Sequence, residues 1–320
     1  MLLSTNKVIN KIIRGDALKV LKQLPDESVH CVVTSPPYWA LRDYRVKGQL
    51  GLEPTFHEYL SKLCEIFDEV KRLLKPTGTC WVNMGDTYAS PTKGHGNSKR
   101  SRVAMYASLQ QRGRLSQTRY KIGLPVKSLC QLPARFAIEM TARGWTLRNE
   151  IIWHKPNCMP SSAKDRFTVD FEKVFFFVKS RKYYFEQQYE ELQDKERLTR
   201  RLLNPSAKRK RVYGDTRIAA INPKTIEASR ARMLKRGRYK RCVWRVAVRP
   251  YYGEHFATYP PDLIETPIKA GCPRNGIVLD PFMGSGTTAL VANRLGRKFI
   301  GVELSPAYIR LARARLANDS

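Results

Sequence analysis

The sequence contains no run of eighteen apolar residues, and no two of its seven cysteines form a Cys-x-x-Cys pair. A transmembrane helix needs about 20 apolar residues, so no membrane span is expected. Scattered single cysteines argue against a zinc site and against a disulfide framework. The first seven residues, MLLSTNK, do not resemble a secretory signal peptide. Reduced cysteines without such a segment favour a cytoplasmic protein.

Acidic residues are scarce. The chain of 320 residues has 58 Lys and Arg against 28 Asp and Glu, which gives a formal net charge of +30. This excess is far larger than solubility requires, and it favours a polyanionic partner such as nucleic acid. The length suits one large α/β domain that carries an insertion.

A proline-rich hexapeptide, TSPPYW, follows an apolar run at residues 29–33. The run predicts a buried strand, so the hexapeptide lies where that strand ends. Two prolines stiffen the turn and remove backbone donors. The Ser35 hydroxyl and the Pro36 carbonyl can then accept hydrogen bonds from an exocyclic amino group, while the flat ring of Tyr38 can stack on a base. An ordinary proline turn that closes a strand is the alternative.

A glycine-rich loop without lysine stands near the other end of the chain, in the sequence VLDPFMGSGTT at 278–288. A phosphate-binding P-loop requires Gly-Lys-Ser/Thr, which is absent here. The next apolar run, at 298–302, ends in Glu303, where a carboxylate can accept hydrogen bonds from ribose hydroxyls. The pattern therefore predicts a site for a nucleoside such as S-adenosylmethionine, with a plain βαβ turn as the alternative.

The spacing of apolar residues predicts strands that alternate with helices in both halves of the chain. This alternation indicates a doubly wound, mostly parallel sheet whose ligands bind at the carboxyl ends of the strands. The expected strands are 8–13, 29–33, 79–84, 146–153, 174–178, 242–246, 278–280 and 298–302, with a hairpin arm at 182–185. The expected helices include 56–74, stopped by residues 75–78, and 129–140.

Two segments lack this alternation. Residues 90–121 are rich in Gly, Ser, Gln, Lys and Arg, and a long mobile loop is expected there. Residues 195–249 hold nineteen Lys or Arg and three acids, with only a weak helical pattern. This second segment is interpreted as an insertion that binds DNA.

The two motifs together resemble those of the DNA amino-methyltransferases. In that family the catalytic motif reads Ser/Asn/Asp-Pro-Pro-Tyr/Phe and the cofactor loop reads Asp-Pro-Phe-x-Gly-x-Gly-Thr-Thr. The order found here, catalytic motif first, is similar to the permuted group called β, which occurs in restriction–modification systems. The likeness covers roughly 8–190 and 250–317.

The resemblance implies a methyltransferase domain of the Rossmann-like type at 1–190 and 250–320, with a basic target-recognition insertion at 191–249. It implies S-adenosylmethionine as cofactor, no metal, and double-stranded DNA as partner. A prokaryotic, plasmid or phage origin fits it. Whether a separate restriction endonuclease accompanies the chain, and whether the chain forms a homodimer, stay open.

Site residues follow from the motifs and the resemblance. The catalytic set is Ser35, Pro36, Pro37 and Tyr38. The cofactor set is Asp16, His255, Asp280, Pro281, Phe282, Gly284, Gly286, Thr287, Thr288 and Glu303. The DNA-binding set is Lys208, Arg209, Lys210, Arg211, Arg236 and Arg238. Asp16 is equally well explained as a helix N-cap, and His255 as a packing residue.

The expected reaction transfers a methyl group to N4 of a cytosine flipped out of the duplex. An exocyclic amine is a poor nucleophile because its lone pair is delocalised into the ring, and two acceptors at its N–H groups favour a tetrahedral nitrogen. Positioning two reactants is worth about 7–11 kcal/mol. A general base contributes roughly 10²–10⁴-fold. Positioning therefore dominates, and Ser35 need not act as a base.

Several alternatives remain or are excluded. Adenine N6 is the main one, because Ser at position 35 only leans toward cytosine. RNA or protein-glutamine methyltransferases use the opposite motif order, and a non-catalytic nucleic-acid binder leaves the cofactor loop without purpose. Cytosine C5 methylation needs a Pro-Cys pair, and no proline here precedes cysteine. No nuclease motif is found.

Overall fold

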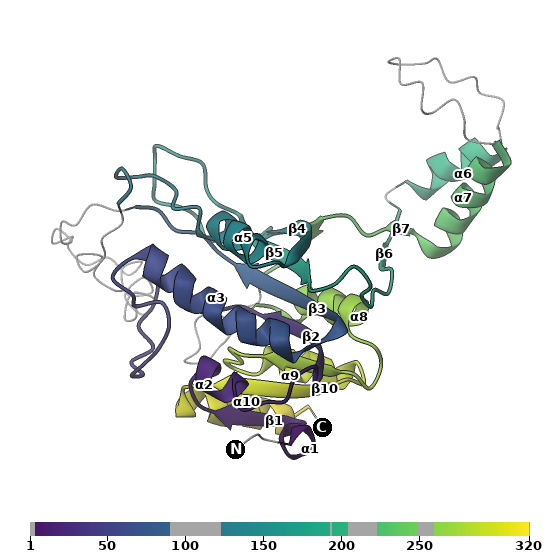
Figure 1. Ribbon diagram of the computed structural model, residues 1–320. Coiled ribbons are helices and arrows are strands. Elements are labelled where there is room, and N and C mark those ends of the chain that lie inside the picture. Colours follow the sequence, from purple (N-terminus) through teal and green to yellow (C-terminus); the bar gives the residue numbers. More distant parts are fainter. Residues whose placement is uncertain (1–3, 90–122, 193, 204–222, 249–258, 320) are drawn as a thin grey trace. The chain divides into compact units, whose positions relative to one another are not determined.

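The computed structural model describes residues 4–89, 123–192, 194–203, 223–248 and 259–319 (Figure 1). The expected loop at 90–121 therefore lies outside the described residues.

The chain divides into two compact units. The first comprises residues 1–186 and 242–320, and the second comprises residues 187–241. The insertion expected at 191–249 is thus bounded differently, because strand β8 (Val243–Arg245) pairs with β4 (Thr146–His154) in the first unit.

The first unit contains an eight-stranded sheet in the order β1-β10-β9-β2-β3-β5-β4-β8. Neighbouring strands are parallel except at β5, which is antiparallel to both of its neighbours. The predicted fold class, a mostly parallel α/β sheet, is confirmed. The remaining strands are β1 (Lys11–Arg14), β2 (Val29–Thr34), β3 (Leu74–Met84), β5 (Phe171–Val178), β9 (Ile277–Asp280) and β10 (Lys298–Glu303).

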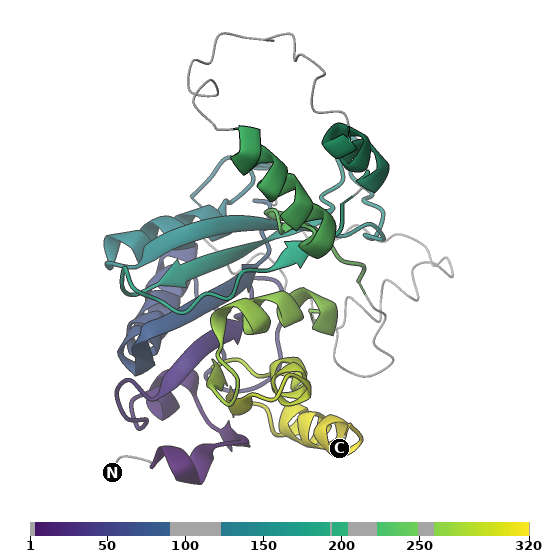
Figure 2. The same cartoon turned by 90° about the vertical axis from the view of Figure 1, so that its right-hand side faces the viewer.

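Helices cover both faces of this sheet (Figures 1 and 2). One buried cluster joins one face of the sheet to α2 (Ala17–Leu21), α3 (Phe56–Leu73) and α5 (Leu132–Ala142). A second cluster joins the other face to α8 (Pro261–Gly271), α9 (Thr287–Arg294) and α10 (Pro306–Ala317). A short helix, α1 (Thr5–Val8), precedes β1.

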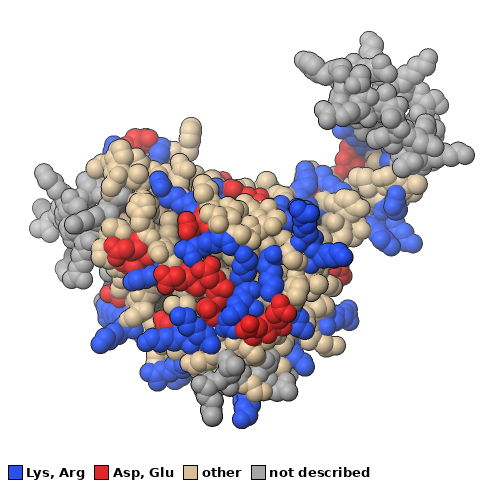
Figure 3. All heavy atoms as spheres, in the orientation of Figure 1, with Lys and Arg blue, Asp and Glu red and all other residues tan. Residues whose placement is uncertain are grey.

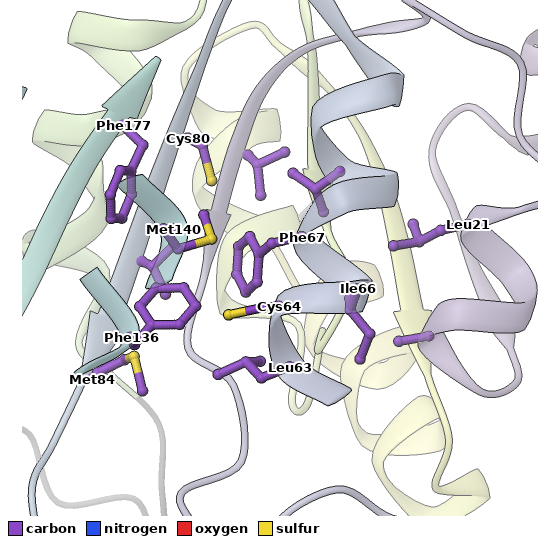
Figure 4. Close-up of a cluster of buried hydrophobic side chains, with 14 of the residues drawn as sticks. Leu21, Leu63, Cys64, Ile66, Phe67, Cys80, Met84, Phe136, Met140 and Phe177 are labelled. Atoms are coloured by element: carbon purple, nitrogen blue, oxygen red, sulfur yellow. The ribbon is translucent and has the colours of Figure 1, made fainter. Parts of the chain in front are cut away.

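Helix α3 shows why the core forms where it does. Its apolar residues recur every three or four positions, so they share one face of the helix. On that face Phe67 packs against Phe136 of α5, with ring centroids 5.2 Å apart and planes at 65°. Figure 4 shows both rings in a cluster with Met140 and Phe177. The Thr55 side chain caps the helix by accepting a hydrogen bond from the Glu58 N–H at 3.1 Å.

Parallel pairing brings the functional strand ends together. The carboxyl ends of β2, β3, β9 and β10 lie at one edge of the sheet, which we call the carboxyl edge. Because β5 is antiparallel, its first residues lie at the same edge, where Lys173 pairs with Met84. The sheet therefore gathers six segments that are far apart in sequence: the ends of β1, β2, β3, β9 and β10 and the start of β5.

Two predictions about the turn regions are wrong. The helix expected at 56–74 does end before residues 75–78, at Leu73, but the strand expected from residue 79 already begins at Leu74, which pairs with Val29 before a register shift. Residues 182–185 were expected to form a hairpin arm. These four residues form no strand. The Tyr184 N–H does donate to the Thr77 carbonyl at 2.8 Å, but this bond is not part of a strand ladder.

The first strand also begins later than expected. Residues 5–8 are helical, and Asn10 has a positive φ of 57°, so β1 starts at Lys11 rather than at residue 8. A positive φ is incompatible with a continuous strand.

The second unit contains two short strands and two helices among its described residues. Strand β6 (Tyr189–Glu190) pairs antiparallel with β7 (Arg238–Tyr239), while α6 (Lys195–Leu203) and α7 (Pro223–Arg236) contact each other. The Glu190 carboxylate accepts from Arg238 Nε at 2.6 Å and from Arg241 Nε at 2.8 Å. The helical pattern in this part of the sequence is weak because apolar residues are sparse, so periodicity alone does not reveal these two basic helices.

Candidate functional site

The TSPPYW turn begins where β2 ends at the carboxyl edge. Thr34 is buried, and its hydroxyl donates to Asp280 Oδ1 of β9 at 2.6 Å. The Tyr59 hydroxyl of α3 donates to the Pro37 carbonyl at 2.9 Å. Contacts from a strand and from a helix therefore fix the turn on both sides.

The glycine loop is shaped by its backbone. Gly284 and Gly286 have positive φ values of 53° and 83°. A Cβ atom on Gly286 would lie 2.8 Å from the Ala312 side chain of α10, which is closer than real Cβ contacts. The loop therefore needs glycine at 286 both for its backbone conformation and for its packing.

Asp280 lies behind the glycine loop and is almost fully buried. Besides Thr34, its carboxylate accepts from Thr288 Oγ1 at 2.5 Å, from Tyr259 at 3.1 Å and from the Phe282 N–H at 3.0 Å. Burial raises the pKa of this carboxyl, and the hydrogen bonds oppose that rise. The side chain thus connects the TSPPYW turn to the glycine loop from within the protein.

Glu303 ends β10 and points into the carboxyl edge. Its Oε2 accepts from the Gly284 N–H at 2.8 Å and its Oε1 from the Ser305 N–H at 2.7 Å. Burial raises its pKa, while these backbone hydrogen bonds act in the opposite direction. A carboxylate has about four lone-pair sites, so roughly two remain for a ligand.

A cavity of about 440 Å³ opens between the two motifs. Among the predicted residues, its walls include Asp16, Ser35, Pro37, Pro281, Phe282, Gly284 and Glu303. Sequence reasoning missed other wall residues, among them Tyr44, Gln49, Leu50, Glu53, Lys62 and Tyr308. The rings of Tyr44 and Tyr308 meet edge to face, with centroids 6.0 Å apart. The sequence offered two signals for these wall residues: Tyr44 is an aromatic residue six positions after Tyr38, and Tyr308 is an aromatic residue in the helix after Glu303.

The other predicted residues lie elsewhere. Pro36, Tyr38, Asp280, Gly286, Thr287 and Thr288 are not among the residues that line the cavity. Thr287 and Thr288 are buried, and the Thr287 hydroxyl accepts from Arg315 at 3.2 Å. Asp16 lines the cavity and also caps α2, because its Oδ1 accepts from the Lys19 N–H at 3.0 Å.

Tyr38 lies beside the cavity, with its hydroxyl directed at the start of β5. The hydroxyl donates to Glu172 Oε2 at 2.7 Å and accepts from Ser35 Oγ at 3.4 Å. Burial, and next the negative charge of Glu172, hold the Tyr38 pKa well above its usual value. The hydroxyl therefore stays protonated and donating at neutral pH. Nothing in the sequence pattern pointed to Glu172.

The predicted DNA-binding residues are only partly described. Lys208, Arg209, Lys210 and Arg211 lie outside the described residues, as does His255 of the cofactor set. Arg236 is exposed in the last turn of α7, whereas Arg238 is paired with Glu190. On the face of the first unit seen in Figure 3, basic side chains are interleaved with acidic ones.

Metal clusters and membrane spans are both absent from the described part of the chain. Among these residues, no group of three or more His, Cys, Asp or Glu side chains could hold a metal ion. Within the same ranges, no helix is long and apolar enough to span a membrane.

Known proteins with similar sequences are DNA methylases. A family model described as DNA methylase, covering N6 and N4 enzymes, matches residues 29–314. Type II methyltransferase M.XycI of Xanthomonas campestris pv. cyanopsidis is 39% identical over 97% of this chain and 88% of its own length. Type II methyltransferase M.SmaI of Serratia marcescens is 37% identical over 96% of this chain and 90% of its own length.

Two solved structures share the fold. The Thermus thermophilus protein TTHA0409, in complex with S-adenosyl-L-methionine, superimposes with a TM-score of 0.57 at 24% identity and covers 97% of this chain and 94% of its own. The PvuII DNA methyltransferase, described as cytosine-N4-specific, gives a TM-score of 0.60 at 21% identity over 95% of this chain and 85% of its own. These structures show the fold, and the family model with the sequence relatives shows that the chain belongs to the DNA amino-methyltransferase family, whose members methylate N6 of adenine or N4 of cytosine.

Proposed function

We propose that this chain transfers a methyl group from S-adenosylmethionine to N4 of a cytosine flipped out of duplex DNA. The observation that carries the proposal is the cavity that joins Glu303 to Ser35. One wall carries a carboxylate suited to a nucleoside, and another carries the acceptor suited to an amino group.

The cavity residues fit S-adenosylmethionine. Its volume of about 440 Å³ falls in the range of small-molecule sites, roughly 300–1,000 Å³. Glu303 would accept from the ribose hydroxyls, and Gly284 allows close approach because it has no side chain. Phe282 and Leu50 supply apolar wall for the adenine ring. When bound, the cofactor supplies an electrophilic methyl group on sulfur.

The protein's own contribution is positioning. The Ser35 hydroxyl and the Pro36 carbonyl would accept from the two N–H groups of the target amine and orient its lone pair. The buried hydrogen bond from Thr34 to Asp280 holds the turn in place relative to the glycine loop. Since orientation contributes about 7–11 kcal/mol, a rigid turn accounts for more of the rate than a general base.

The choice of cytosine rests on Ser35. A neutral hydroxyl replaces the carboxylate that adenine enzymes of the family usually carry at this position, and one structural relative is described as cytosine-N4-specific. Adenine N6 is the second candidate, because the same pair of acceptors would bind its amino group. The second unit, residues 187–241, is proposed to recognise the target sequence.

The test is to identify the product. Unmethylated DNA is incubated with the protein and S-adenosylmethionine, digested to nucleosides, and separated by chromatography with mass detection. N4-methylcytosine is expected, and a standard of 5-methylcytosine separates the two isomers by retention. N6-methyladenine would establish the second candidate, and absence of any methylated nucleoside from a protein that binds DNA would overturn the enzyme assignment.

A further inference from the structure

The Tyr38 ring is anchored by contacts outside the two motifs. Its hydroxyl donates to Glu172 Oε2 at 2.7 Å, and the Asn83 Oδ1 lies 3.3 Å away. Along the ring edge, a Cβ on Gly85 would lie 2.6 Å from Cε2, so the backbone at the end of β3 touches the ring. These contacts use the hydroxyl and one edge, which are the parts that a stacked base does not cover.

Glu172 is itself fixed by two neighbours. Its Oε2 also accepts from Asn83 Nδ2 at 3.0 Å, and its Oε1 forms an ion pair with Lys155. The side chains of Glu172 and Lys155 are only 17% and 18% exposed. The Lys155 ammonium also lies 4.4 Å from the Trp153 ring centroid, a cation–π contact that fixes its place. A largely buried, charge-balanced carboxylate is a rigid acceptor.

The topology of the sheet creates this arrangement. Lys155 follows β4, Asn83 lies near the end of β3, and Glu172 is the second residue of β5. An antiparallel β5 is required, because a parallel strand in this position would place its first residues at the opposite edge. Two segments far from Tyr38 in sequence, carrying Asn83 and Glu172, therefore reach its hydroxyl group, and a third, carrying Lys155, holds Glu172.

We infer that Glu172 is a positioning residue for the methyl transfer proposed above, acting through Tyr38. The carboxylate holds the tyrosine ring in its stacking orientation before the base arrives, and Lys155 and Asn83 hold the carboxylate. Because the Tyr38 hydroxyl also accepts from Ser35 Oγ at 3.4 Å, the same anchor orients the acceptor for the target amine. The inference rests on the proposed function.

The consequence is a specific pattern of kinetic effects. With the anchor removed, the ring rotates among several orientations, so the bound base is less often aligned. Loss of a hydrogen-bond partner that orients a metal ligand typically lowers activity by about 10–100-fold, and a loss of the same size is expected for a group that orients Tyr38. Glu172→Ala should therefore lower kcat by this factor, with little change in KM for S-adenosylmethionine. Glu172→Gln should recover most of the loss, because an amide oxygen can still accept from the tyrosine hydroxyl.

A double-mutant cycle tests the connection. Steady-state methylation of a duplex substrate is measured for Glu172→Ala, Tyr38→Phe and the double variant. Tyr38→Phe keeps the ring but lacks the hydroxyl, so the double variant should be no slower than the slower single variant. Glu150→Gln is the matched control, because Glu150 forms a lysine pair with Lys173 on the same two strands without contacting Tyr38.

Three outcomes would overturn the inference. One is an additive cycle, in which Glu172→Ala costs the same factor with and without the tyrosine hydroxyl. Another is a loss in Glu150→Gln equal to that in Glu172→Ala. The third is a Glu172→Gln variant as slow as Glu172→Ala whose kcat no longer depends on pH, which would make the carboxylate a proton acceptor. A wild-type protein that methylates nothing would instead refute the proposed function.

Discussion

Replacing Glu303 by alanine should weaken S-adenosylmethionine binding far more than it weakens the fold. The carboxylate lies on the cavity wall, and its two backbone partners, Gly284 and Ser305, leave roughly two acceptor sites for ribose hydroxyls. Hydrogen bonds to a charged group contribute about 1.5–3 kcal/mol each. Loss of both bonds therefore costs about 3 kcal/mol or more, which corresponds to a Kd roughly 100-fold higher.

The glutamine variant provides an internal comparison. Glu303→Gln keeps one acceptor oxygen but replaces the other by a donor, so one ligand bond survives. Its Kd should rise by about tenfold, since roughly 1.4 kcal/mol corresponds to a factor of ten. The Kd should therefore increase in the order wild type, Glu303→Gln, Glu303→Ala. Only in the alanine variant do the N–H groups of Gly284 and Ser305 both lose their acceptor.

Isothermal titration calorimetry with S-adenosylmethionine measures these affinities directly, and circular dichroism shows that each variant is folded at the temperature used. Glu265→Ala on α8 is the control, because this carboxylate pairs with Lys269 and does not line the cavity. If Glu303→Ala binds the cofactor as tightly as wild type, the nucleoside is not held by this carboxylate and the site has been misplaced.

The pH dependence of binding follows from the same residue. Burial raises the Glu303 pKa above its usual value, so the carboxyl gains a proton at a higher pH than an exposed glutamate. Affinity should fall as the pH drops through this raised pKa, because the protonated form has lost acceptor sites. The opposite sign holds for stability: the folded state holds this proton more tightly, so ionisation lowers stability as the pH rises through the same window. The acid loss of affinity should be absent in Glu303→Gln.

Three further predictions concern catalysis, the glycine loop and DNA. Ser35→Ala and Tyr38→Ala should each lose transfer of labelled methyl groups to DNA while calorimetry shows unchanged cofactor affinity; a fully active Tyr38→Ala would exclude a stacking role. Gly286→Ala should lower both thermal stability and cofactor affinity, because its Cβ would lie 2.8 Å from Ala312 at a positive φ; an unchanged melting temperature would contradict this. Duplex binding should weaken with salt at a log–log slope of about −0.9 per phosphate contact, and charge reversal at 208–211 should flatten that slope; an unchanged slope would exclude these residues from the interface.

The parts of the site that sequence could predict are those that local pattern determines. An apolar run followed by prolines, and another followed by glycines, locate two strand ends without knowledge of the fold. Glu303 was predictable for the same reason, because it terminates the next apolar run. The sheet then brings these ends together, since parallel strands place their carboxyl ends at one edge.

The parts that could not be predicted depend on contacts between distant segments. Glu172 follows a segment with no catalytic pattern, and its role emerges only because β5 runs antiparallel to β3. Asp280 was predicted as a cofactor-binding residue because it belongs to the glycine-loop motif. Its side chain is buried and does not line the cavity, because Thr34 and Thr288 donate to its two oxygens. A motif identifies residues that belong to a site but does not tell which side chains face the ligand.

Asp280 is buried and does not line the cavity, but it connects the two motifs of the site. The carboxylate accepts a hydrogen bond from the Thr34 hydroxyl, which lies in the TSPPYW turn 246 residues earlier in the chain. It accepts another from the Thr288 hydroxyl, in the helix after the glycine loop. The turn proposed to bind the target amine and the loop proposed to bind the methyl donor are therefore attached to one buried group. Such hydrogen bonds are strong in a low-dielectric interior and cannot be exchanged for water. Since positioning accounts for most of the expected rate, the residue that sets the distance between the two halves of the site matters as much as those that touch the reactants.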